Sequence, residues 1–221
     1  MTTAALAVLA LLQAPVAQGV LVVREDTVEI ARETFRLTSS PSRGDTSWTL
    51  STTIRYDRSR PIVVLNPVLV IGGDSLPRTL QYDVADACGR RTVLAQFGRG
   101  RVTVREVSPG VERAREYHAA GRTVILDDSV FALYVVAAWF AAPTPVSVTA
   151  IFPRQGRRET LTVRDDGVLA TTVNRDPARL RRVTIGGGAS GTVHVWLNDV
   201  GRPLKIEIPG RRVVAELLPG G

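Results

Sequence analysis

Hydrophobic and polar residues alternate along most of this chain. A period of two is typical of a strand with one buried face, and it is clearest from Trp48 to Tyr56. Similar segments recur between turn residues, at 21–37, 62–71, 80–84, 93–97, 102–106, 146–152, 161–163, 168–173, 183–185, 193–197, 204–208 and 213–217. This pattern of about ten to twelve short strands at hairpin spacing predicts a mainly β fold, built as an antiparallel meander.

One stretch breaks the alternation, an unbroken apolar run from Val130 to Ala142 that ends at Pro143. Asp127-Asp128-Ser129 precedes it, and such side chains cap helix N-termini, so we predict a helix at about 128–142. Apolar residues occupy every face of this helix, so it must be enclosed. It is shorter than the roughly 20 residues that a membrane span needs. A long sheet with one apolar face must bend to hide that face. We therefore expect a curved sheet, a half-barrel or open barrel, packed around one central apolar helix.

Some connections are less regular. The charged segment 113–121 fits either a strand or a mobile flap. Asp165-Asp166-Gly167 predicts a hairpin turn, and 176–182 fits one helical turn. Residues 186–191 contain the spacing G-x-G-x-x-G of dinucleotide-binding loops, but the residues that follow alternate like a strand, so we predict a hairpin loop.

The length of the chain favours one domain, and its N-terminal segment favours export. The chain has 221 residues and no linker-like segment, which suits a single β-rich domain over 20–221. Residues 1–19 look like a signal peptide, because a short apolar core at Ala4–Leu12 is followed by small residues at Ala17-Gln18-Gly19. A buried N-terminal helix is the alternative. Cys88 is the only cysteine, so the chain has no internal disulfide.

The formal net charge of +7 raises the question of nucleic-acid binding. The excess is arginine, since Lys205 is the only lysine, and it is spread over the whole chain among acidic residues. Such interleaving favours cross-strand ion pairs on a solvated face. We therefore expect no nucleic-acid partner.

Candidate chemistry is sparse. The only histidines are His118 and His194, no set of residues has metal-ligand spacing, and no serine lies in a nucleophile elbow. We expect no catalytic residue, no metal and no cofactor, and hence a protein that is not an enzyme. A hydrolase would need one of these histidines to meet a carboxylate and a hydroxyl in one cleft.

Two segments, 125–131 and 193–209, resemble a family of exported bacterial proteins of unknown function. In that family a hydrophobic-Asp-Asp/Asn segment is followed by a V-W-L-(D/N)-x-x-G-R-x-L hairpin, as in Val195 to Leu204 here. The family is distantly similar to the half-barrel carriers that shuttle lipid-modified proteins across the periplasm. The resemblance implies a periplasmic or secreted bacterial protein, a curved sheet with a helical plug, and no catalytic residues.

Aromatic side chains are frequent in and around the predicted helix and could line an apolar cavity under a curved sheet. The candidate ligand-binding residues are Trp48, Tyr82, Phe131, Tyr134, Trp139 and Phe140. We therefore expect non-enzymatic binding of a hydrophobic ligand, such as a lipid or acyl chain. The alternative is a solid core and a structural or protein-interaction role in the cell envelope, with an envelope protein as partner.

Overall fold

The computed structural model describes residues 15–42, 45–189 and 191–219. Within them the elements follow in the order β1 (Pro15–Glu25), β2 (Val28–Ser42), β3 (Asp45–Tyr56), β4 (Val63–Ile71), β5 (Pro77–Asp86), β6 (Gly89–Gly98), β7 (Arg101–Ser108), β8 (Val111–His118), β9 (Thr123–Ile125), α1 (Ala132–Ala138), β10 (Val146–Phe152), β11 (Arg157–Val173), β12 (Asp176–Gly188), β13 (Gly191–Leu197), β14 (Pro203–Ile208), the 3-10 helix η1 (Pro209–Arg211) and β15 (Val213–Leu217). The predicted mainly β fold around one helix is confirmed.

All the strands belong to one sheet, in the order β8 to β1 and then β15 to β9. The first and last strands, β1 and β15, are antiparallel neighbours in the middle of this sheet. β8 and β9 follow each other in the chain but lie at opposite edges of the sheet. An up-and-down barrel would close by pairing them. Here the sheet stays open, and all neighbours are antiparallel except β9 and β10, which are parallel.

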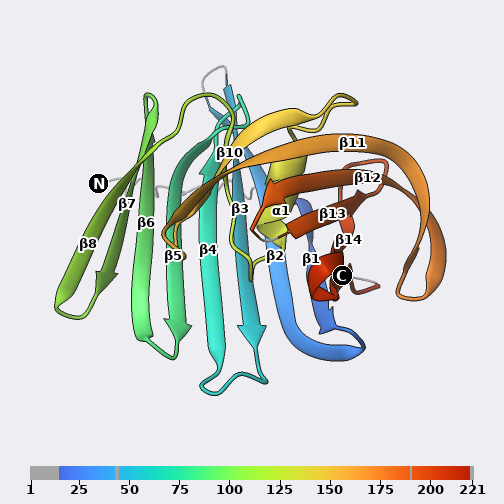
Figure 1. Cartoon of the computed structure of the whole chain (residues 1–221), viewed down its shortest axis with the longest axis horizontal. Coiled ribbons are helices and arrows are strands. Elements are labelled where there is room, and N and C mark those ends of the chain that lie inside the picture. Colours follow the sequence, from blue (N-terminus) through green and yellow to red (C-terminus); the bar gives the residue numbers. More distant parts are fainter. Residues whose placement is uncertain (1–14, 43–44, 190, 220–221) are drawn as a thin grey trace, which may run out of the picture.

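The two edges of the curled sheet overlap instead of pairing (Figure 1). β9 contacts β5, so the second edge lies inside the first. At the outer edge, the Nε of Arg158, on β11, donates to the carbonyl of His118, on β8, at 2.9 Å. The overlap buries the inner faces of β6 and β7, including Val93, Ala95 and Val102. We call the line where the outer layer β5–β8 meets the inner layer β9–β11 the seam.

Three sequence predictions about connections are settled here. Segment 113–121 is a strand as far as His118, because it belongs to β8. The predicted turn at Asp165-Asp166-Gly167 is wrong, since these residues form a bulge within the long strand β11. The predicted helical turn at 176–182 is also wrong, because these residues belong to β12. The hairpin turns at Asn174-Arg175, whose φ angles of 50° and 76° suit a two-residue turn of type I′.

α1 lies within the curl of the sheet (Figure 1), and all seven of its residues are buried. It spans Ala132–Ala138, so it is shorter than the predicted 128–142. The predicted cap by Asp127-Asp128-Ser129 is wrong: the N-cap residue is Phe131, and no local side chain caps the helix. Instead Glu33, on β2, accepts hydrogen bonds from the backbone N–H groups of Phe131 and Ala132.

The predicted signal segment lies mostly outside the described residues. Its last five residues, Pro15–Gly19, belong to β1, where Ala17 and Gly19 pair with Leu37 and Phe35. No helix in the part of the chain that the structure describes has the length and hydropathy of a membrane span.

Candidate functional site

Two buried carboxylates flank the segment that leads into α1. Glu33 has no exposed surface, and Oγ1 of Thr52, on β3, donates to its Oε1 at 2.8 Å. The N–H groups of Phe131 and Ala132 donate to its two oxygens at 2.8 and 3.0 Å. Burial raises the pKa of Glu33 to about 7, and these three hydrogen bonds oppose the rise. Glu33 thus titrates near neutral pH while it holds the start of α1.

Asp127 lies at the other side of this segment and is also fully buried. Arg154 binds both of its oxygens, at 2.7 and 2.8 Å, and the hydroxyl of Tyr82 donates to Oδ2 at 3.0 Å. The N–H of Ser129 donates to Oδ1 at 2.8 Å. Burial and the charge of Asp127 raise the pKa of the Tyr82 phenol, so it stays protonated. The carboxylate is therefore surrounded by donors from β5, the β10–β11 turn and its own turn.

Neither carboxylate faces an open space. Both accept hydrogen bonds that fix the backbone at 129–132, and the hydroxyls beside them, Thr52 at Glu33 and Tyr82 at Asp127, are themselves buried. A general base needs a substrate proton within reach, either directly or through a water molecule. We therefore assign Glu33 and Asp127 to positioning the start of α1.

His194 does meet a hydroxyl and a carboxylate, but in the wrong order for a hydrolase. Its Nδ1 lies 3.0 Å from Oγ1 of Thr184, and Thr184 in turn donates to Asp166. A catalytic triad places the carboxylate on one ring nitrogen and the hydroxyl on the other. Partial burial, followed by the charge of Arg182, lowers the pKa of His194. His118 is exposed at the end of β8.

The described residues contain no group of three or more His, Cys, Asp or Glu side chains that could hold a metal ion. The expectation that the protein uses neither metal nor cofactor stays a prediction, as does the expectation that it is not an enzyme.

The six residues predicted to bind a ligand divide into two groups. Tyr82, Phe131 and Tyr134 are buried in the core, with at most 2 % of their surface exposed. Trp48, Trp139 and Phe140 are only partly buried and lie around the C-terminal end of α1. The rings of Trp48 and Trp139 meet edge to face, with centroids 5.6 Å apart.

Little empty space remains between α1 and the sheet. The cavity that Trp139 lines with Val135, Leu37 and Leu50 has a volume of about 20 Å³, enough for about one water molecule. This cavity beside α1 is therefore far too small for an acyl chain.

Phe140 lines a much larger hollow of about 840 Å³, at the end of the seam. We call this hollow the seam groove. The β4–β5 loop, the β6–β7 turn and the β8–β9 connection converge on it, with Leu76, Phe97 and Ala120 among its apolar lining. Figure 1 shows the chain crossing from β8 toward the interior at this end of the sheet. The volume falls within the roughly 300–1,000 Å³ that is typical of ligand sites.

Arginines surround the seam groove. Arg78, Arg99, Arg101 and Arg122 line it, against the single carboxylate of Asp74. Arg78 pairs with Asp74 at 2.8 Å. The groove thus combines an apolar wall with an excess of positive charge.

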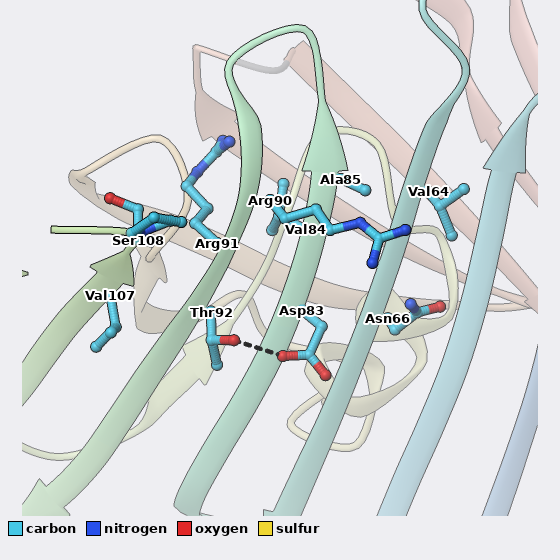
Figure 2. Close-up of a pocket in the computed structure, with 11 residues that line it drawn as sticks. Val64, Asn66, Asp83, Val84, Ala85, Arg90, Arg91, Thr92, Val107 and Ser108 are labelled. Atoms are coloured by element: carbon cyan, nitrogen blue, oxygen red, sulfur yellow. Dashed lines mark hydrogen bonds between the residues drawn. The ribbon is translucent and has the colours of Figure 1, made fainter. Parts of the chain in front are cut away.

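A second hollow, of about 760 Å³, lies on the outer face of β4–β7. Figure 2 shows Asn66, Asp83 and Thr92 side by side on three neighbouring strands, with the Thr92 hydroxyl donating to Asp83 at 2.7 Å. The registers Asn66↔Asp83 and Asp83↔Thr92 place them in one row across the sheet. Val64 and Val107 flank this row. This outer-face hollow is lined by Asp83, Arg90 and Arg91, and Arg91 is paired with Asp86 and Glu106, so its excess of positive charge is smaller than that of the seam groove.

Sequence reasoning missed Phe97 and the arginines of the seam groove. The alternation Val93-x-Ala95-x-Phe97 predicts a strand position for Phe97, and a buried structural role is the usual one there. The arginines are separated by up to 44 positions, from Arg78 to Arg122, so only the fold brings them together. The one local signal was the cluster Gly98-Arg99-Gly100-Arg101, a turn with two charges.

These features define a β-barrel-like protein: an open, curled antiparallel sheet that encloses one short helix, with a groove where its edges overlap. No known family matches the sequence, and no curated protein matches it. The structure is similar to a β-barrel-like protein of DUF1849, a domain of unknown function, from Brucella abortus, with a TM-score of 0.52 and 12 % identity over 91 % of this chain and 94 % of that one.

It also aligns with a DUF1089 family protein from Pseudomonas aeruginosa, with a TM-score of 0.41 and 12 % identity over 92 % of this chain and 94 % of that one. The likeness to the Brucella protein shows the fold alone. The description of the Brucella protein names no function, so the expected likeness to lipoprotein carriers stays a prediction.

Proposed function

We propose that this protein binds a hydrophobic ligand, such as an acyl chain, in the seam groove, and that it does so in the periplasm or after secretion without catalysing a reaction. The observation that carries the proposal is the contrast in free volume, about 840 Å³ in the seam groove against about 20 Å³ beside α1. The export-like segment at 1–19 supports the location.

The proposal moves the ligand from the interior to the seam. Of the six candidate residues, Phe140 lines the groove, and Trp139 precedes it in the chain. Phe131, Tyr134 and Tyr82 support the core instead, because their side chains are buried. Apolar side chains that stay partly exposed around a hollow are typical of a binding site.

A substitution that fills the groove tests this function. Ala120 is exposed and lines the groove, so Ala120→Trp adds bulk there without removing any core side chain. The matched control is Ala170→Trp, an exposed alanine on β11. Binding of the neutral fluorophore N-phenyl-1-naphthylamine, and its displacement by monoolein, is then measured for each protein.

We expect the natural protein and Ala170→Trp to bind the fluorophore and release it to monoolein, and Ala120→Trp to lose most of this binding. Absence of displaceable binding in the natural protein would overturn the proposal. Equal binding by Ala120→Trp would show that the ligand lies elsewhere.

The alternative, a protein-interaction module, is favoured by the outer-face hollow, where Val107 keeps 38 % of its surface exposed beside other apolar groups. Under this alternative a Val107→Asp variant loses protein partners in a pull-down from envelope extract. The Ala120→Trp variant keeps them.

A further inference from the structure

We propose that the seam groove selects an anionic amphiphile, and that Arg99 and Arg122 bind its head group while the apolar wall holds its chain. This inference rests on the proposed function and adds the class of ligand to it.

The arginines of the groove differ in whether they form an ion pair. Arg78 pairs with Asp74 at 2.8 Å, and Arg101 with Glu116 at 3.6 Å. Arg99 and Arg122 have no ion pair within the described residues, as is true of about half of the arginines there, but these two line an apolar groove. Two guanidinium groups at this groove therefore lack a carboxylate.

These two arginines lie on neighbouring turns that are fixed to each other. Arg99 precedes Gly100 and Arg122 follows Gly121, and both glycines have φ of 73°. The N–H of Ala119 donates to the carbonyl of Gly100 at 2.9 Å, which ties the β8–β9 connection to the β6–β7 turn. No atom lies within 4 Å of the position that a Cβ would take at either glycine. Arg99 and Arg122 are themselves exposed and line the groove, so their guanidinium groups are accessible to a ligand.

An arginine fork suits carboxylate and phosphate groups, because its N–H donors match two oxygens at once. A purely polar anion would leave Phe97, Phe140 and Leu76 of the same groove uncovered. A neutral lipid would leave Arg99 and Arg122 without a counter-charge. An amphiphile with one acyl chain and an anionic head group satisfies both parts of the groove.

The test compares ligands that share a chain and differ in charge. Oleate, oleoyl lysophosphatidate and monoolein displace N-phenyl-1-naphthylamine from the natural protein, from the double variant Arg99→Gln/Arg122→Gln, and from the control Arg175→Gln/Arg179→Gln. The control removes the same charge from exposed positions at the β11–β12 hairpin.

For the natural protein and the control we expect the two anions to bind about tenfold more tightly than monoolein, a gain that is lost in roughly 0.5 M salt. In the groove variant the anions should weaken about tenfold, with monoolein unchanged. The comparison of oleate with lysophosphatidate tells a carboxylate from a phosphate preference.

Equal affinity for monoolein and both anions would overturn this inference and leave the proposed function standing. Failure of all three ligands to bind would overturn the proposed function itself. An equal loss of anion binding in both double variants would assign the effect to overall charge and reject the two named arginines.

Discussion

Titration of the buried Glu33 predicts that the protein loses stability as the pH rises from about 4.5 to about 7. Its pKa is raised from 4.5 to about 7 in the folded protein, chiefly by burial. Between these two values the folded state holds a proton that the unfolded state has released. Stability from this group is therefore fully present below about pH 4.5 and is lost as the pH rises to about 7.

The size of the effect follows from the shift. A rise from 4.5 to about 7 corresponds to roughly 3 kcal/mol of unfolding free energy, at about 1.4 kcal/mol per pKa unit. Most of this, about 2–3 kcal/mol, falls between pH 5 and pH 8. For a domain whose total stability is about 5–15 kcal/mol, such a change is easily measured.

The assay is urea unfolding at pH 5, 6, 7 and 8, for the natural protein and for Glu33→Gln. The glutamine cannot titrate, while every other ionisable group is kept. The difference in unfolding free energy between the two proteins therefore isolates Glu33. From pH 5 to pH 8 the natural protein should lose about 2–3 kcal/mol of unfolding free energy relative to Glu33→Gln.

A second variant checks the cause. Thr52 donates one of the three hydrogen bonds that oppose the rise in the pKa of Glu33, so Thr52→Val should move the pH window of the loss upward. If the difference in unfolding free energy between the natural protein and Glu33→Gln did not change with pH, the raised pKa of Glu33 would be refuted. If instead the natural protein became more stable than Glu33→Gln as the pH rose, the hydrogen bonds from the start of α1 would outweigh burial and lower the pKa of Glu33.

Further predictions concern the segment before α1 and the helix itself, and urea unfolding measures each. Arg154→Met leaves the fully buried carboxylate of Asp127 without its ion-pair partner and should cost about 3–5 kcal/mol, whereas a cost below about 1 kcal/mol would refute this role. Tyr56→Phe removes the 2.8 Å hydrogen bond to the carbonyl of Ser129 and should cost about 1 kcal/mol, with no loss if water replaces the hydroxyl. Leu133→Ala opens a cavity at a position with no exposed surface and should cost about 2–5 kcal/mol, and a smaller cost would mean that the core collapses around it.

The general architecture could be predicted from the sequence because it depends on local periodicity. The alternation from Trp48 to Tyr56 corresponds to β3, and the apolar run after Ser129 contains α1. The failures arose where local chemistry was ambiguous. Asp165-Asp166-Gly167 has the composition of a tight turn, but the arginines of β12 hold its carboxylates across a bulge, so the strand continues.

The cap of α1 shows why the remaining features lay beyond the sequence. Asp127 has the residue type and position of a local cap, but its oxygens are taken by Arg154, Tyr82 and Ser129. The helix start is instead satisfied by Glu33, which lies 98 positions earlier than Phe131 in the chain. A glutamate is usually solvated, but Glu33 shares the period-two phase of Ala31 and Phe35, so its side chain points to the buried face of β2. Its partner at the start of α1 is supplied by the fold alone.

The same reason explains why the seam groove could not be predicted. Its walls come from segments that touch only because β8 and β9 pass each other instead of pairing, and no periodicity encodes that choice. Had the two strands paired, the β8–β9 connection would close the barrel, and Phe97 and Phe140 would not meet across an open hollow. The failure of the sheet to close creates the cavity that a solid, helix-filled core does not offer, so a ligand-binding role for this fold depends on the seam rather than on the interior.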